Sequence, residues 1–316
     1  MATNAATAQE SISVLPGTDV QAHPNRRALV TLALLTVYII WGTTYLGIRY
    51  ALESFPPYLL MGIRFFVAGG GLLIVLRLQG AAMPTRKQWR SAMIVGGLLL
   101  LGGMGSVAMA EETVSSGLAA MLVATAPLWT LIISMRWGNR PGRMEWIGVA
   151  IGLLGVALLT LEGNIQANPG GVALIIFATL CWSLGSVWSK YLDMPKGAMG
   201  NAAEMFAGGT MLLVLGLLSG ERIAAAPTTS ALLALIYLTI FGSLATMTAY
   251  MFLLKTVKPS LATSYAFVNP AIALVLGGVV GGEVITGSAL IALPVILIGV
   301  AFVAFGHRNN SAADGR

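Results

Sequence analysis

Residues Thr256 to Leu274 read TVKPSLATSYAFVNPAIAL, and an earlier stretch, Thr113 to Leu131, reads TVSSGLAAMLVATAPLWTL. Aligned with a shift of 143 positions, the two stretches share six identical residues, among them Pro127 in the first copy and Pro270 in the second. Each stretch is long and apolar and has its proline near the middle. We therefore expect two copies of one membrane unit, each containing a proline-bearing helix.

The composition assigns the chain to the polytopic helical membrane proteins. Of its 316 residues, 57% are hydrophobic and only 9% are charged, whereas soluble domains carry about 25% charged residues. Several apolar runs are roughly 20 residues long, which as helices cross a hydrocarbon core of about 30 Å. The alternating segments of a membrane barrel are not found in the sequence.

Ten apolar segments follow a polar N-terminal tail, and short connections marked by proline and glycine separate them. No connection has room for a soluble domain. The expected membrane helices lie near residues 29–48, 57–76, 91–110, 116–135, 144–161, 170–189, 198–218, 231–253, 260–280 and 286–306.

The basic residues predict the orientation. With the N-terminus inside, 15 of the 18 Lys and Arg residues fall on the cytoplasmic side, as the positive-inside rule requires. Both termini are then cytoplasmic, as a disordered tail over residues 1–28 and a short tail over 307–316. The net charge of +6 is thus a topology signal and not a sign of nucleic-acid binding.

The repeat extends beyond the proline helices. Trp41 matches Trp182 at a shift of 141 positions, and Arg64 matches Glu204 at a shift of 140. Residues 29–163 and 168–306 are the two predicted units. Because each has five helices, the second enters the membrane from the opposite side, so we expect an all-α integral membrane fold of ten transmembrane helices in two inverted repeats. Such repeats recur in secondary transporters, with the substrate site at their interface.

Arg64 and Glu204 are the ionisable residues that the predicted helices place well inside the membrane. A buried charge is costly there and usually faces the bundle interior. Arg64 is a candidate for an anionic group of a substrate and Glu204 for a cation or proton. The alternative is that neighbouring helices neutralise both side chains and that they only affect packing.

The proline helices supply candidate hinges, Pro127 and Pro270, because each proline leaves a carbonyl without its helical partner. The second copy is the polar one, with Tyr265 and Asn269 where the first has Leu122 and Ala126. Aromatic side chains of other helices are candidate stacking surfaces, although an aromatic residue in a membrane helix more often serves packing. The predicted substrate-binding residues are Trp41, Thr44, Tyr45, Arg64, Trp182, Ser186, Glu204, Tyr250, Tyr265 and Asn269.

No cofactor, metal site or enzyme activity is expected. Cys181 is the single cysteine, and His23 and His307 lie in the tails, which excludes a cysteine-built metal site and an intrachain disulfide. The glycine pairs do not follow a strand, so they are not a nucleotide fingerprint. There is no phosphate-binding loop, and ATP is not expected as the energy source.

The chain resembles a known family in its Trp41-Gly42 start, its Arg64 helix, its Pro127 and Pro270 helices and its Gly281-Gly282-Glu283 turn. These features are similar to those of the drug/metabolite transporter superfamily, of its EamA type, and of the YedA-like bacterial inner-membrane group. The resemblance covers residues 29–306 and implies ten helices, cytoplasmic termini and export of small molecules by alternating access. One departure is Asn139-Arg140, where many relatives repeat the Gly-Glu pair.

These features, together with the resemblance, which alone implies export, predict a secondary transporter of the bacterial inner membrane that exports small amphipathic metabolites, amino acids or drugs. A passive channel or facilitator is an alternative, but sparse polar residues argue against the polar stripe of a channel. A membrane assembly or sensor protein is the third possibility. The expected partners are a small-molecule substrate and the bilayer, with protons as a candidate coupling ion and no nucleic acid. A monomer and a homodimer are both compatible with the sequence.

Overall fold

The computed structural model describes residues 24–138, 142–161, 168–256 and 265–313, and in these ranges the regular secondary structure is helical, with no strands. The first half contains α1 (Pro24–Leu52), α2 (Pro57–Leu78), α3 (Arg86–Gly96), η1 (Gly97–Gly105), α4 (Ser106–Glu111), α5 (Ser116–Val123), α6 (Ala126–Ser134), η2 (Met135–Trp137) and α7 (Arg143–Leu161). The second half contains α8 (Pro169–Trp188), α9 (Ala198–Leu218), α10 (Thr229–Tyr237), η3 (Leu238–Ala245), α11 (Thr246–Thr256), α13 (Tyr265–Val279) and α14 (Gly287–Ala313).

The helices follow the predicted apolar segments. Over the described residues, each of the ten segments is helical apart from a few positions at its ends and one turn inside the fourth. In the described part of the chain, seven helices are long and apolar enough to cross a membrane, and two shorter apolar helices, Val268–Val279 and Gly287–Gly299, accompany them. The fold is therefore all-helical and membrane-embedded.

The first and last helices are longer than predicted. Helix α1 begins at Pro24 and α14 continues to Ala313, so residues expected in the tails are helical next to the apolar segments. A helix ends at a capping or breaking residue and not where hydropathy falls. The rest of the N-terminal tail, residues 1–23, lies outside the described residues.

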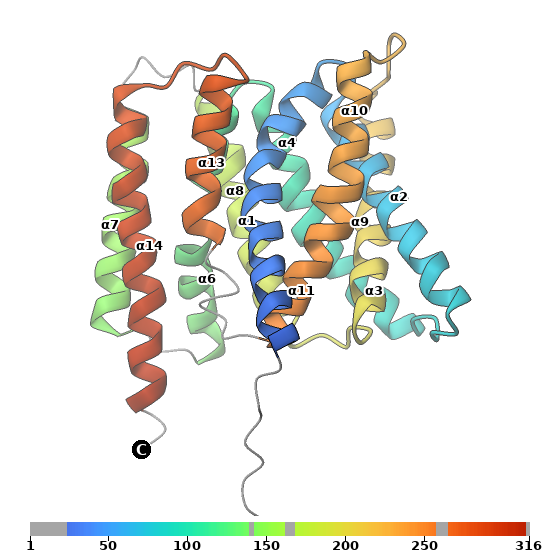
Figure 1. The fold of residues 1–316 in the computed structure, drawn as a ribbon, viewed down its shortest axis with the longest axis horizontal. Coiled ribbons are helices and arrows are strands. Elements are labelled where there is room, and N and C mark those ends of the chain that lie inside the picture. Colours follow the sequence, from blue (N-terminus) through green and yellow to red (C-terminus); the bar gives the residue numbers. More distant parts are fainter. Residues whose placement is uncertain (1–23, 139–141, 162–167, 257–264, 314–316) are drawn as a thin grey trace, which may run out of the picture.

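Figure 1 shows a flattened bundle with one packed helix pair at each edge. Helices α7 and α14 pack along their length at the left edge, and α2 packs against α9 towards the right. Helices α1, α4, α6, α8 and α13 lie between these pairs. Each edge pair joins one helix from the first half of the chain to one from the second, so the two halves are held together at both edges.

The α2–α9 crossing is reciprocal. A Cβ atom at Gly69 would overlap the backbone nitrogen of Phe206, and a Cβ atom at Gly209 would overlap the backbone nitrogen of Phe66. Gly209 and Phe206 lie 140 positions after Gly69 and Phe66, and the two phenylalanine rings pack with their centroids 4.9 Å apart. Small residues allow this close backbone approach, which is a main source of packing energy between membrane helices.

The α7–α14 crossing has the same character. A Cβ atom at Gly155 would lie 2.6 Å from Cγ1 of Ile296, and one at Gly299 would lie 2.5 Å from the backbone nitrogen of Gly152. Ile296 and Gly299 lie 144 positions after Gly152 and Gly155. Both edges of the bundle thus use glycines at corresponding positions of the two halves.

Two wide helical turns also occupy corresponding positions. The π-helices η1 (Gly97–Gly105) and η3 (Leu238–Ala245) each interrupt a longer helix, and η3 begins 141 positions after η1. In η3, the hydroxyl of Thr246 donates to the carbonyl of Phe241 at 2.7 Å. π-Helical turns are rare in proteins, but those that occur are often found at functional sites. Their corresponding positions in the two halves therefore mark the helices around them as candidates for such a site.

The helix predicted around Pro127 is divided, which corrects the expectation of one long helix in each copy. Helix α5 ends at Val123 and α6 begins at Ala126. The turn between them is closed by hydrogen bonds from the backbone and the hydroxyl of Thr125 to the carbonyl of Leu122, at 3.1 Å and 2.6 Å. Pro127 then occupies the first turn of α6, where its missing N–H costs nothing.

Pro270 lies inside α13, which runs without a break from Tyr265 to Val279. The residues before Tyr265 in the predicted helix lie outside the described residues. The two proline helices therefore differ in the described part of the chain, because the first has Thr125 to close a turn and the second has no such turn.

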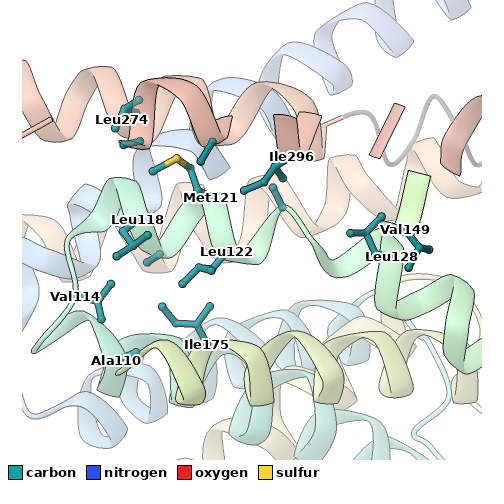
Figure 2. Close-up of a cluster of buried hydrophobic side chains, with 14 of the residues drawn as sticks. Ala110, Val114, Leu118, Met121, Leu122, Leu128, Val149, Ile175, Leu274 and Ile296 are labelled. Atoms are coloured by element: carbon teal, nitrogen blue, oxygen red, sulfur yellow. The ribbon is translucent and has the colours of Figure 1, made fainter. Parts of the chain in front are cut away.

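The divided helix is packed into a cluster of buried apolar side chains. Figure 2 shows Leu118 and Leu122 of α5 beside Ile175 of α8, with Met121 on the side of Leu274 of α13. The cluster joins helices from both halves of the chain at the turn. The break at Ala124–Thr125 is therefore supported on several sides by packing.

Two glutamates close helix N-termini at one end of the bundle. The carboxylate of Glu221 accepts from the backbone nitrogens of Tyr58 and Leu59 at 3.2 Å and 2.8 Å. Glu283 accepts from the backbone nitrogens of Ser116 and Gly117 at 2.9 Å and 3.2 Å. Helix N-termini present unpaired N–H groups and a positive dipole end, so each carboxylate connects the second half of the chain to a helix of the first.

The reciprocal crossing predicts a clear stability difference between two glycines of α2. Gly69→Ala should lower the unfolding free energy by about 1–3 kcal/mol, the usual cost of overpacking, because its Cβ atom would overlap the backbone of α9. Gly71→Ala is the matched control, since its Cβ atom would have no neighbour within 4 Å. Thermal unfolding of both purified variants in detergent measures the difference, and equal melting temperatures would contradict the crossing.

Candidate substrate-binding site

A cavity lies among the central helices of the bundle. It has a volume of about 70 Å³, which is room for roughly five water molecules. Both halves of the chain contribute to its wall. The lining residues are Trp41, Thr44, Tyr45, Ile48, Gly103, Met104, Val107, Ala120, Val123, Ala124, Ala126, Pro127, Ala178, Thr179, Trp182, Tyr265, Asn269 and Pro270.

Aromatic rings form one side of the cavity. The ring of Trp41 packs edge-on against Trp182, with centroids 6.5 Å apart, and against Tyr265, at 4.8 Å. Tyr250 supports this group from behind, 5.2 Å from Trp41 and 5.6 Å from Tyr265. Edge-to-face aromatic contacts of this kind are favourable and hold the rings in a defined orientation.

The wall is mostly apolar, and no described residue that lines it carries a formal charge. Its polar groups are hydroxyls, indole N–H groups and the amide of Asn269. The Thr44 and Thr179 hydroxyls donate to carbonyls of their own helices, at 2.7 Å and 2.8 Å. A molecule with a net charge would lose its hydration here without gaining a counter-ion, so the cavity suits neutral, zwitterionic or weakly polar molecules with an apolar part.

The wide turn η3 holds the wall in place from outside the cavity. Trp41 donates through Nε1 to the carbonyl of Gly242 at 3.3 Å, and Arg64 donates through Nε to the Ser243 hydroxyl at 2.8 Å. A Cβ atom at Gly242 would lie 2.9 Å from Nη2 of Arg64 and 3.0 Å from Cγ2 of Thr44. The glycine thus leaves the space in which a guanidinium packs directly behind the cavity wall.

Asn269 connects α13, the helix that contains Pro270, to α1. With its amide oriented to match the surrounding acceptors, Nδ2 donates to the carbonyls of Tyr265 at 3.2 Å and Tyr38 at 3.1 Å. The side chain is 5% exposed and also lines the cavity. Asn269 thus both makes structural hydrogen bonds and forms part of the cavity wall.

The structure brings together eight of the twelve residues predicted for the site. Those that line the cavity are Trp41, Thr44, Tyr45, Trp182, Tyr265, Asn269 and the two prolines, Pro127 and Pro270. Tyr250 lies behind the aromatic wall, and Ser186 donates to the carbonyl of Trp182 in its own helix at 2.7 Å.

Arg64 and Glu204 do not reach the cavity. Arg64 is fully buried and its Nη2 atom has no hydrogen-bond acceptor, while Glu204 is 9% exposed and its Oε1 atom has no donor. Among the described residues, the ion pair that lies within 4 Å is Lys87 with Asp193, so Arg64 and Glu204 are not paired with each other. In this conformation, their predicted contact with a substrate has no geometric support.

Sequence reasoning missed a buried acid next to the cavity. Glu111 is 1% exposed at the end of α4, and neither of its carboxylate oxygens has a hydrogen-bond partner. The apolar segment was predicted to end at Ala110, so Glu111 was assigned to a connection. Hydropathy gave no signal for its burial, because the packing of neighbouring helices decides what surrounds a residue at a helix end.

Comparison with known proteins gives the family. Residues 28–161 and 169–305 each match the EamA-like transporter family. The chain is 43% identical over 275 residues to the uncharacterized inner membrane transporter YedA of Escherichia coli (strain K12), and the match covers 87% of this chain and 90% of YedA.

More distant relatives are also named as transporters. The uncharacterized transporters YoaV and YdfC of Bacillus subtilis (strain 168) are 26% and 29% identical, over 86% and 83% of this chain and 95% and 87% of their own lengths. A solved crystal structure with 22% identity superposes with a TM-score of 0.65, over 89% of this chain and 98% of that one, which is a likeness of fold.

Two successive family matches cover most of the chain, and a relative of 43% identity aligns over most of both proteins. These matches agree with the all-helical fold and its long apolar helices. The chain therefore belongs to the EamA-like transporter family and is a multi-pass membrane protein.

Proposed function

We propose that this protein is a secondary transporter of the bacterial inner membrane that exports small amphipathic molecules by alternating access between two inverted five-helix repeats. The central cavity is the observation on which the proposal rests. It lies between the halves of the chain, has aromatic walls and carries no formal charge. Its small volume means that a metabolite-sized substrate requires the cavity to widen, as an opening of either end of the bundle would allow.

The positions of corresponding residues support the repeat. Gly69 with Gly209, Gly155 with Gly299, and η1 with η3 are separated by 140 to 144 positions and make equivalent structures. The family matches fall on two successive stretches, one in each half. Ten helices in two inverted units explain these pairs with one arrangement, and inverted repeats of this kind commonly move against each other around a central site.

The cavity also narrows the class of substrate. An aromatic or aliphatic body fits the Trp41 and Trp182 wall, and one or two polar groups fit the hydroxyls and Asn269. Aromatic amino acids and flat amphipathic drugs meet this description. The relatives YedA, YoaV and YdfC are named as transporters without a named substrate, so the direction of export rests on the resemblance to the drug/metabolite transporter superfamily.

The proposed orientation can be tested with two exposed positions. Lys87 lies near the start of α3, and Arg222 lies beyond the end of α9. With both termini in the cytoplasm, Lys87→Cys should resist a membrane-impermeant maleimide in intact cells, and Arg222→Cys should react, each in a Cys181→Ala background. The opposite pattern would reverse the orientation, and permeabilised cells are the control because both positions should then react.

Transport itself can be tested by counterflow in proteoliposomes with two probes of different charge, L-tryptophan as a zwitterion and ethidium as a cation. Saturable exchange of L-tryptophan is expected, and Trp182→Ala should raise its KM about tenfold, since an aromatic contact is worth about 1.4 kcal/mol. Trp146→Ala is the matched control, because Trp146 is 46% exposed and does not line the cavity.

The outcomes separate the candidate functions. An unchanged KM in Trp182→Ala would remove the cavity as the site. Flux that neither saturates nor supports exchange would indicate a passive channel. Exchange that is equally weakened in Trp146→Ala would report a general loss of stability and not a loss of binding.

A further inference from the structure

Glu111 lies directly beyond the cavity at one end of the bundle. It follows the candidate membrane span Arg86–Ala110, and Val107, one helical turn earlier on α4, lines the cavity. The connection from α13 to α14, which contains Glu283, crosses this same end of the bundle, the upper end in Figure 1. We call Glu111, Ser116 and Glu283 the Glu111 layer, because the backbone nitrogen of Ser116 donates to the Glu283 carboxylate at 2.9 Å and Glu283 lies close enough to Glu111 for the two carboxyl groups to interact.

Glu111 and Glu283 are neighbouring acids in opposite environments. Glu283 accepts two hydrogen bonds from the N-terminus of α5, at 2.9 Å and 3.2 Å. Neither carboxylate oxygen of Glu111 accepts a hydrogen bond. A buried carboxylate without hydrogen-bond donors is costly, and binding a proton removes its charge, so Glu111 is the acid of the two whose surroundings lack the donors that a carboxylate needs.

The charged and titratable groups around Glu111 come from few elements. Helix α1 contributes Tyr45 and Arg49, α2 contributes Tyr58 and Arg64, and the segment before α14 contributes Glu283. The other described elements packed against α4 are η1, α5 and α8, which contain no Asp, Glu, Lys, Arg or His. The only thiol among them is Cys181 of α8, and its sulfur lies near Gly102.

The cations nearby do not satisfy the carboxyl group by hydrogen bonds. Arg49 donates through Nη1 to the main-chain carbonyl of Glu111 at 3.3 Å. Burial raises the pKa of Glu111 well above its ordinary value, and the Glu283 carboxylate raises it further, while Arg49 and Arg64 lower it in part. The closed layer thus favours a protonated Glu111.

We propose that Glu111 is a proton-binding site that couples closure of this end of the bundle to proton uptake. While the layer is closed, the carboxyl group holds the proton. When the layer opens to water, the group ionises and is stabilised by water and the guanidinium of Arg49. The inference rests on the proposed function, because the proton has a role in transport only if the two ends of the cavity open in turn.

The first test measures the proton itself by infrared titration of the purified full-length protein in detergent. Wild type and Glu112→Gln should show a carboxyl band that is lost well above the ordinary glutamate pKa of about 4.3, and Glu111→Gln should lack it. Glu112 is the matched control as the adjacent, exposed acid, and the band of Glu111 is read from the difference between the wild-type and variant spectra, in which unchanged acids such as Glu204 cancel. Identical titrations of the three proteins would overturn the proposal.

The second test measures opening through Ser116→Cys in a Cys181→Ala background. Ser116 is fully buried next to the Glu283 carboxylate, so its labelling by a maleimide reports opening of this layer. The labelling rate is measured at pH 6 and at pH 9. The ratio of the two rates should be about ten times larger in the protein that keeps Glu111 than in Glu111→Gln. A factor of ten corresponds to a difference of about one unit between the pKa of Glu111 in the closed layer and in the open layer. The ionisation of the thiol itself cancels in this ratio.

Glu111→Asp keeps the proposal falsifiable if Glu111→Gln does not fold, because it keeps a carboxyl group and should retain both the titrating band and the pH-dependent labelling. The same pH dependence with and without an acid at position 111 would overturn the coupling. Neither measurement needs a transported substrate. If counterflow is absent while the infrared band and the pH-dependent labelling are both observed, the result counts against the proposed function alone. If counterflow is observed while these two signals are absent, the result counts against this inference alone.

Discussion

The close approach of backbones at the two edges of the bundle is the constraint on which the other features depend. At Gly69 and Gly209, and again at Gly155 and Gly299, the absence of a side chain lets helices from the two halves touch directly. In a bilayer, where apolar side chains gain little by leaving lipid, such packing holds helices together. Because the contacts are concentrated at the edges, the central helices can diverge around a cavity.

Sequence reasoning recovered the helical membrane fold, since each long apolar run must be a helix when no water is present to satisfy its backbone. Eight residues of the cavity wall were among those predicted for the site, because groups such as Trp41, Trp182 and Asn269 stood out as large or polar side chains inside apolar helices. Sequence reasoning did not predict the divided helix at Thr125, where a hydroxyl and a short turn replaced regular helical bonds.

The positions of the charged residues were the least predictable part. Depth along a helix placed Arg64 and Glu204 correctly inside the bundle, but the rotation of each helix decided what they face, and hydropathy does not determine rotation. Glu111 was missed for a related reason, since the neighbouring helices, and not the apolar run before it, decide that this residue at the end of α4 is buried. The roles of these three residues therefore follow from tertiary contacts and not from sequence pattern.

The hydrogen bonds of the cavity wall determine which polar groups remain for a guest molecule. The hydroxyl protons of Thr44 and Thr179 and the indole proton of Trp41 are already donated to carbonyls of the protein. At the two hydroxyls, what faces inward is therefore oxygen lone pairs. At these two positions, a guest that supplies its own N–H or O–H protons can satisfy the oxygens, whereas one that offers only acceptors cannot, so Thr44 and Thr179 favour molecules with donors even though the wall carries no charge.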